Sequence, residues 1–283
     1  MLCFDGKVSL YCFLGSALPF CCLLFFNLTS NFLFQFWGSV YWVPIIYYIF
    51  INVIIRTVYK GYAYQIAVRA TFLGFIFALG IYIKTIAPDH IKMFGIYMCV
   101  MSTFHYSEFL CIAFIQPKLV SIDSFVINHS LQYTVAAVTS WLEFFVETYF
   151  FPGLKTVFWL SYIGLIVCIV GEILRKAAML TAQSNFNHLV QCEKADDHVL
   201  VTHGVYSWFR HPSYVGWFYW SIGTQVILVN PFCIIAYAVA SWFFFKERIT
   251  IEEIMLLNFF GQQYCDYQQN VGTGLPFIDG YKM

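Results

Sequence analysis

Residues 203–217 read HGVYSWFRHPSYVGW, and an apolar helical pattern continues directly from them. A second apolar run ends near Phe245 and leads into Glu247-Arg248, with Glu252-Glu253 one turn later. Arg, His and paired Glu residues therefore lie at the ends of apolar segments. Ionisable groups are costly near lipid, so their presence there is by default a functional-site hypothesis. The pattern predicts membrane helices with a binding or reactive site at their polar ends.

The composition is that of a membrane protein. Of the 283 residues, 60% are hydrophobic and 21% aromatic, and the mean hydropathy is +0.71. Charged residues make up 11%, against about 25% in soluble domains. We therefore expect an all-α, polytopic integral membrane protein. The formal net charge is zero and no nucleic-acid motif occurs, so we expect no nucleic-acid partner.

The 10 cysteines are scattered, mostly within apolar runs, and form no Cys-x-x-Cys pair. We interpret them as small buried hydrophobic residues, not as a disulfide framework or a zinc site, and we expect no metal. Palmitoylation of Cys21-Cys22 stays open as an alternative. Lys7 precedes an apolar run that has no convincing cleavage site, which indicates a first membrane helix and not a signal peptide.

Long apolar segments separated by Pro, Gly and charged residues predict the membrane helices. A span needs about 20 apolar residues. Six segments meet this length approximately: 8–26, 34–55, 64–83, 93–115, 130–150 and 155–174. Two shorter segments, 213–229 and 231–245, flank the turn signal Asn230-Pro231. They correspond to roughly 25 and 22 Å, less than the ~30 Å core, and predict a helical hairpin. We expect about eight transmembrane helices and a cytosolic C-terminal helix.

The distribution of Lys and Arg predicts the orientation, because cytosolic loops carry an excess of both. With both termini cytosolic, the lumenal loops hold only Lys84, Lys92 and Lys155, and Arg69 is ambiguous. The other basic residues are then cytosolic: Lys7, Arg56, Lys60, Lys118, Arg175, Lys176, Lys194, Arg210, Lys246, Arg248 and Lys282. We expect segments 175–212 and 246–283 to lie beside each other in the cytosol.

Charge is concentrated toward the C-terminus, where residues 172–283 carry more than half of the charged residues. We expect one membrane-embedded unit. In it, residues 1–170 form the transmembrane anchor and substrate-access helices, and residues 171–283 form the catalytic and cofactor-binding part. Gly164 and Gly171 are expected to let two helices approach closely.

Arg248 and Glu252 are four residues apart and share one face of a predicted helix. Two interpretations are open. In the first, they form an interfacial ion pair, with Arg248 extending to lipid headgroups. In the second, they form an anion clamp beside a hydroxyl acceptor. The planar guanidinium matches a carboxylate, and a Glu carboxylate accepts hydrogen bonds from two neighbouring ribose hydroxyls.

His211-Pro212-Ser213-Tyr214 stands where the first short helix is expected to begin. Pro suits the first turn of a helix, and the free N–H groups of a helix N-terminus attract dipolar or anionic ligands. The stretch is either a cap at the membrane interface or a docking point for a dipolar cofactor. By composition, the polar stretch 191–206 is an ordinary solvated loop. Positive-inside anchoring explains Arg175-Lys176, with a role for Glu172 or Arg175 near the active site as the alternative.

Several other enzyme classes are disfavoured by the absence of their motifs. No Gly-x-Gly-x-x-Gly follows a predicted strand, so no soluble dinucleotide site is expected. No His-Glu-x-x-His or Gly-x-Ser-x-Gly occurs, which disfavours zinc membrane proteases and hydrolases with a serine elbow.

The chain resembles the isoprenylcysteine carboxyl methyltransferase family in four motifs: Gly204-Val205-Tyr206, Arg210-His211-Pro212-Ser213-Tyr214-Val215-Gly216, Arg248-Ile249 with Glu252-Glu253, and Gly274-Leu275-Pro276-Phe277. The specific part of the resemblance covers residues 171–277, whereas the N-terminal part matches mainly in length and helix count. A lone Arg-His-Pro is a weaker signal, because phospholipid methyltransferases and sterol reductases share a related C-terminal pattern.

The resemblance implies methyl transfer from S-adenosylmethionine to the C-terminal carboxylate of prenylated cysteine in CaaX-processed proteins, including small GTPases. It also implies the endoplasmic reticulum membrane as the location. Arg248 would be the catalytic residue and hold the substrate carboxylate. S-adenosylmethionine would contact Gln191, His198, Val199, Leu200, Val201, Tyr206, His211, Pro212, Ser213, Tyr214 and Glu252. Val199 to Val201 would be a short extended piece whose backbone reads the purine edge.

This chemistry suits a site at the cytosolic membrane interface. A C-terminal carboxylate is ionised at pH 7, so no general base is needed. Catalysis then consists of desolvating the carboxylate, aligning it with the methyl group and excluding water. The methyl donor is water-soluble and enters from the cytosol, whereas the prenyl chain enters sideways from the bilayer.

Three other functions fit the sequence less well. A sterol reductase-like enzyme using NADPH needs basic groups for the 2′-phosphate, and 184–214 holds no extra Arg cluster. Phospholipid N-methylation has an amine acceptor, which Arg248 would repel. A transporter or channel predicts polar residues at mid-membrane in several helices, whereas here they gather at one interface.

Overall fold

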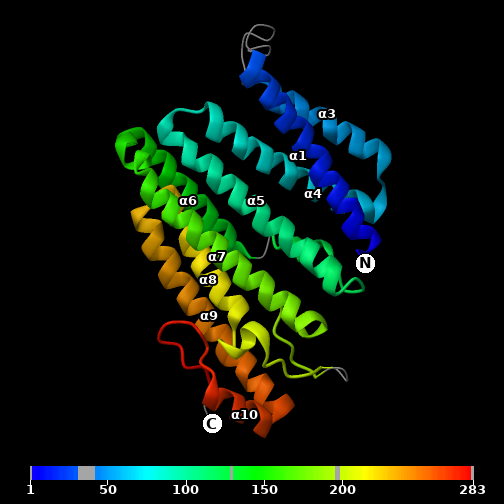
Figure 1. The fold of residues 1–283 in the computed structure, drawn as a ribbon, viewed down its shortest axis with the longest axis vertical. Helices are drawn as coiled ribbons and strands as arrows, with labels where there is room; N and C mark the ends of the chain where they lie inside the picture. The colour runs from blue at the N-terminus through cyan, green and yellow to red at the C-terminus, as the bar shows by residue number, and fades with distance from the viewer. Residues whose placement is uncertain (1, 31–41, 128–129, 195–197, 282–283) are drawn as a thin grey trace. The chain divides into compact units, whose positions relative to one another are not determined.

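The computed structural model describes residues 2–30, 42–127, 130–194 and 198–281. Regular structure within these ranges is helical throughout, which agrees with the all-α prediction. The long helices are α1 (Phe4–Ser30), α3 (Trp42–Val58), α4 (Gly61–Ile86), α5 (Asp89–Ile115), α6 (Leu131–Phe150), α7 (Phe158–Ala182), α8 (Pro212–Leu228) and α9 (Pro231–Phe260), followed by the short α10 (Gln262–Asn270) (Figure 1). Four 3₁₀ turns are η1 (Ile122–Phe125), η2 (Pro152–Thr156), η3 (Gln183–Asn185) and η4 (Gly204–Ser207).

The predicted apolar segments coincide with helices, and the expected punctuation lies at their ends. Pro212 and Pro231 are the first residues of α8 and α9, because proline fixes a helical φ and the missing N–H is unneeded in the first turn. Part of the expected segment 34–55 falls in residues 31–41 and therefore lies outside the described residues, as does Lys282.

The number of membrane-spanning helices is only partly supported by length and composition. Within the described ranges, α4 and α5 are long and apolar enough to cross a membrane, and α3 is apolar but has 17 residues. The other helices carry large apolar side chains on their outside. On α7, for example, Trp159, Ile166 and Ile173 are each more than 60% exposed.

The second arm of the predicted hairpin is longer than the sequence suggested. We expected it to end near Phe245, but α9 continues without a break for 30 residues to Phe260. The stretch around Lys246 contains neither Pro nor Gly, so nothing in the backbone stops the helix there. Both Arg248 and Glu252 therefore lie on the same helix as the apolar segment.

The chain divides into two compact units. The first comprises Met1–Thr134 and Phe145–Phe158, and the second comprises Val135–Phe144 and Trp159–Met283. In the first unit α1, α4 and α5 pack against one another, with Phe13 stacked on Tyr106 at 3.9 Å between ring centroids. The second unit contains α7, α8, α9 and α10 and holds all of the predicted site residues.

Glycine pairs set the distance between α7 and α8 in the second unit. A Cβ atom on Gly171 would lie 2.6 Å from the carbonyl oxygen of Gly216, and one on Gly164 would lie 2.8 Å from that of Gly223. Both positions need glycine because the two backbones touch. The expectation for Gly164 and Gly171 is thus confirmed. The contact brings the end of α7 against the beginning of α8.

The turn between α8 and α9 is held by hydrogen bonds to α6. Glu143 accepts hydrogen bonds from the backbone N–H groups of Phe232 and Cys233, both at 2.8 Å. Asn230 donates to the backbone oxygen of Ser140 at 2.9 Å. These contacts satisfy free N–H groups in the first turn of α9 and fix the far end of the hairpin, whose opposite end carries the candidate site.

Candidate active site

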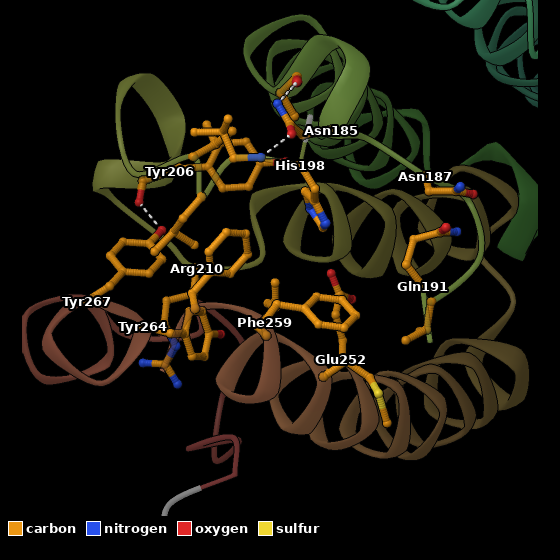
Figure 2. Close-up of a pocket in the computed structure, with 18 of the residues that line it drawn as sticks. Asn185, Asn187, Gln191, His198, Tyr206, Arg210, Glu252, Phe259, Tyr264 and Tyr267 are labelled. Atoms are coloured by element: carbon orange, nitrogen blue, oxygen red, sulfur yellow. Dashed lines mark hydrogen bonds between the residues drawn. The ribbon is translucent and has the colours of Figure 1, made fainter. Parts of the chain in front are cut away.

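A cleft opens between the loop that follows α7 and the C-terminal half of α9 with α10 (Figure 2). Seven residues predicted to contact a cofactor line it: Gln191, His198, Val199, Leu200, Val201, Tyr206 and Glu252. The side chains of His198 and Glu252 point into it from opposite sides, one from the loop and one from α9 (Figure 2). The structure therefore brings together residues that are up to 61 positions apart in sequence.

The wall formed by α9 is largely apolar. Leu256, Phe259 and Phe260 line the cleft, and the His198 ring meets the two phenylalanine rings edge-on, at 5.8 and 5.4 Å between centroids. Leu200 packs on a buried cluster that includes Tyr264 and Tyr267. The result is a slot with apolar faces and a carboxylate at its edge.

Polar contacts tie the loop to its surroundings. The Val199 N–H donates to the side-chain oxygen of Asn185 at 2.8 Å (Figure 2). Lys194 donates to the backbone oxygen of Phe259 at 3.0 Å, and its ammonium group lies 4.6 Å from the Phe260 ring centre. These contacts hold the loop against α9 and give the cleft its second wall.

Arg248 and Glu252 do share a face, and Tyr214 connects them. The Arg248 Nε donates to the Tyr214 hydroxyl at 2.8 Å, and that hydroxyl donates to Glu252 Oε2 at 2.5 Å. Tyr214 is buried and stacks on His211, with 5.6 Å between ring centroids and 7° between ring planes. The Tyr214 hydroxyl thus bridges the Glu252 carboxylate at the cleft and the Arg248 guanidinium.

Arg248 is half-buried and does not line the cleft itself. Its Nη2 donates to the backbone oxygen of His188. Among the described residues, Nη1 has no hydrogen-bond partner. The guanidinium is therefore positioned by two contacts and keeps one nitrogen available for an anion.

Three residues predicted to contact the cofactor are buried and do not line the cleft: His211, Pro212 and Ser213. Ser213 accepts a hydrogen bond from the Arg175 guanidinium at 2.8 Å. Arg175 is 1% exposed and lies 4.5 Å from the Trp217 ring centre. The beginning of α8 is thus held to the end of α7 by a buried cation.

Glu253 is the centre of a second buried network. It is fully buried and its carboxylate accepts hydrogen bonds from Arg210 Nε at 2.8 Å and His211 Nε2 at 3.1 Å. Further donors are the Tyr264 hydroxyl at 3.1 Å, the Gln268 amide at 3.1 Å and the backbone N–H of Tyr281 at 2.7 Å. Glu253 therefore joins the start of α8 to α10 and to the C-terminal segment.

Arg210 completes this network from the other side. It is buried at 7% exposure and also donates to the backbone oxygens of Gln268, Val271 and Asp279. Part of Arg210 lines the cleft, but its guanidinium points away from it, toward the C-terminal segment (Figure 2). The Arg-His pair of the motif is thus anchored by the second Glu of the Glu-Glu pair.

Several residues that line the cleft were not predicted as donor contacts, among them Phe259, Tyr264 and Tyr267. The Tyr267 hydroxyl donates to the backbone oxygen of Tyr206 at 2.5 Å (Figure 2). Burial raises the pKa of the Tyr264 and Tyr267 phenols above their usual value, so both stay protonated as donors. The sequence does contain a pattern that could have indicated both tyrosines. Tyr264 and Tyr267 are three residues apart in a polar stretch, a spacing that places them on one face of a short helix.

The fold and the site define a class: an all-helical protein of apolar helices with a ligand cleft at their polar ends. The family model described as "Isoprenylcysteine carboxyl methyltransferase (ICMT) family" matches residues 163–258. The protein-S-isoprenylcysteine O-methyltransferase of Tribolium castaneum is 64% identical over the full length of both chains. That of Homo sapiens is 56% identical over 82% of each chain.

A solved structure agrees with these relatives. It is described as the eukaryotic intramembrane Ras methyltransferase ICMT without a monobody, and it is 63% identical. The match has a TM-score of 0.95 and covers 99% of this chain and 100% of that one. The chain belongs to the isoprenylcysteine carboxyl methyltransferase family, as the motif resemblance indicated.

Proposed function

We propose that this protein transfers a methyl group from S-adenosylmethionine to the C-terminal carboxylate of prenylated cysteine in CaaX-processed proteins, including small GTPases. Family membership supports a methyltransferase that acts on isoprenylcysteine. One structural observation carries the assignment of roles. The Tyr214 hydroxyl links Arg248, a candidate carboxylate ligand, to Glu252 at the edge of the cleft.

The cleft fits an adenosine-containing methyl donor. Leu256, Phe259 and Phe260 offer apolar surface for a purine, and Glu252 offers a carboxylate for ribose hydroxyls. Of the proposed cofactor contacts, Gln191, His198, Val199, Leu200, Val201 and Tyr206 line the same space. The other proposed contacts are buried and do not line this space: His211, Pro212, Ser213 and Tyr214. When bound, S-adenosylmethionine supplies the electrophilic methyl group.

The acceptor half of the site needs a cation and no base. A C-terminal carboxylate is ionised at neutral pH, so the task of Arg248 is to hold and orient it. Tyr214 and His188 fix the guanidinium through Nε and Nη2, which leaves Nη1 for the carboxylate. Positioning in a site that excludes water is then the main contribution of the protein.

The proposed location is the endoplasmic reticulum membrane, with about eight spans and both termini cytosolic. Residues 1–170 would be the anchor and access helices, and 171–283 the catalytic part. Exposed apolar side chains on α3, α6 and α7 support contact with lipid, including Phe50, Leu142 and Ile163. The prenyl chain would reach the site from the bilayer, and the methyl donor from the cytosol.

The activity itself is tested with purified protein and labelled S-adenosylmethionine. A prenylated cysteine should be methylated, while an unprenylated analogue with the same carboxylate should be nearly inert, because its apolar chain no longer partitions into the bilayer. S-adenosylhomocysteine should raise the melting temperature of the protein in detergent. Stabilisation by NADPH in its place would contradict the methyltransferase assignment.

Orientation is tested with a glycosylation acceptor appended after residue 283. With a cytosolic C-terminus the acceptor should remain unmodified in microsomes, because oligosaccharide transfer occurs in the lumen. The same acceptor inserted beside the exposed Asp89, in the proposed lumenal loop between Lys84 and Lys92, is the positive control. Efficient modification at the C-terminus would place the cleft on the lumenal side and contradict cytosolic access.

Tyr267→Phe tests how the cleft wall is held. The substitution removes the hydrogen bond to the Tyr206 carbonyl, and one such bond contributes about 1 kcal/mol. We expect the KM for S-adenosylmethionine to rise about fivefold with kcat nearly unchanged, because the acceptor side is untouched. Tyr219→Phe, at an exposed tyrosine of α8, is the control. A fall in kcat at constant KM would assign Tyr267 a different role.

A further inference from the structure

The C-terminal loop of residues 274–278 presents one large aromatic side chain outward. Phe277 is 96% exposed, whereas its neighbours Leu275 and Ile278 are 5% exposed. The φ angle of Phe277 is 59°, in the left-handed region that bulky residues rarely adopt. Such an outlier points to a function that the strained position serves. Neither the cleft nor the Arg248 pair uses Phe277.

The loop is clamped from the inside, so Phe277 cannot turn inward. Leu275 and Ile278 pack in the core cluster that contains Phe245 and Ile249. The Thr273 hydroxyl donates to the backbone oxygen of Ile278. Pro276, directly before Phe277, accepts a hydrogen bond from the Trp242 indole at 2.8 Å. The backbone directly before Phe277 is therefore held against Trp242 of α9.

Trp242 marks the end of an apolar stripe on α9. Phe232, Ile235, Val239 and Phe243 are each more than 50% exposed, and their spacing places them on one face of the helix. At the end of this face the Lys246 ammonium group lies 4.9 Å from the Trp242 ring centre. An apolar stripe that ends in Trp and Lys is typical of a helix leaving a bilayer, because Trp prefers the interface and Lys extends into the headgroups.

We propose that Phe277 and Trp242 form a bilayer anchor, in which the C-terminal loop inserts Phe277 into the lipid interface beside the end of the α9 stripe. The indole bond to Pro276 places the loop at the level where the stripe meets water. The occupant is lipid and not a partner protein, because the exposed surface is continuous with the apolar stripe. This anchor is separate from methyl transfer and does not depend on it.

The test places a photoreactive benzoylphenylalanine at position 277 of the full chain in nanodiscs of phosphatidylcholine with some phosphatidylserine, without substrate. Irradiation should give a protein adduct with the mass of one phospholipid, because the side chain lies among acyl chains. Position 243 on the stripe is the positive control. Position 269, an exposed glutamine on α10, is the control that should give no adduct.

Equal lipid adducts at 277 and 243, with none at 269, support the anchor. An adduct at 243 but none at 277, in protein that stays monodisperse by gel filtration, overturns it. Phe277→Trp gives a second measurement. Its added fluorescence should fall at least twofold in nanodiscs of phosphatidylcholine brominated on the upper acyl chain, and unchanged emission counts against lipid contact.

Discussion

Arg248→Ala is expected to abolish most methyl transfer while S-adenosylhomocysteine still binds. Charge-assisted hydrogen bonds contribute about 1.5–3 kcal/mol, which corresponds to a loss of roughly 10- to 150-fold. In a site that excludes water the loss should be larger, since the proposed carboxylate loses the counter-charge placed beside it. Arg248 does not line the cleft, so donor binding should persist. Methylation rate and inhibitor affinity are measured on the same preparation.

Two further variants serve as comparisons for Arg248→Ala. Arg248→Lys keeps the charge but loses the planar fork that reaches Tyr214 and His188, so only partial rescue is expected. Lys118→Ala removes an exposed cation from the proposed cytosolic surface and should leave activity unchanged. Near-normal turnover by folded Arg248→Ala would contradict the role as carboxylate ligand. It would favour the alternative in which Arg248 extends to lipid headgroups at the membrane interface.

Glu253→Ala is expected to unfold the second unit, although the neighbouring Glu252→Ala should not. Glu253 is fully buried and receives five donors, Arg210 among them. Removing one partner of a buried ion pair costs about 3–5 kcal/mol, because the other charge stays buried without compensation. A large drop in melting temperature in detergent is the expected measurement.

Glu252 is the matched comparison for Glu253. It is half-exposed and bonded to Tyr214 at the cleft edge. Glu252→Ala should therefore keep the melting temperature near that of the unmodified protein and lower donor affinity first. If the two variants lose stability equally, the separation between a binding carboxylate and a structural carboxylate is wrong.

The sequence was sufficient for the helices and for much of the cleft. Pro212, Pro231 and the apolar runs predicted where helices begin. The spacing of Arg248 and Glu252 predicted a shared face, and the bridge through Tyr214 agrees with it. Seven residues that the motif resemblance assigned to the donor do line one cleft. Their roles stay predictions until donor binding is measured.

Other features were not predictable from local patterns. The change from apolar to charged residues after Phe245 predicts the end of a helix, but α9 continues. A change from apolar to polar side chains indicates a change from lipid to water around the helix. It does not end the helix, because that requires a residue that breaks the backbone hydrogen bonds, such as proline. Glu252 lies at the cleft edge and Glu253 is buried because the two residues occupy different sides of α9. That follows from tertiary packing against Arg210 and His211, which no single segment encodes.

The unbroken course of α9 has a mechanical consequence. At a rise of 1.5 Å per residue, its 30 residues measure about 45 Å, longer than the ~30 Å hydrocarbon layer. One rigid rod thus carries the lipid stripe, Arg248 and Glu252 in a fixed register. A thicker or thinner membrane tilts or shifts the whole rod. The separation between Arg248, the proposed ligand of the acceptor carboxylate, and Glu252, the proposed donor contact, stays constant. The proposed alignment of the two reactants therefore does not depend on the thickness of the bilayer.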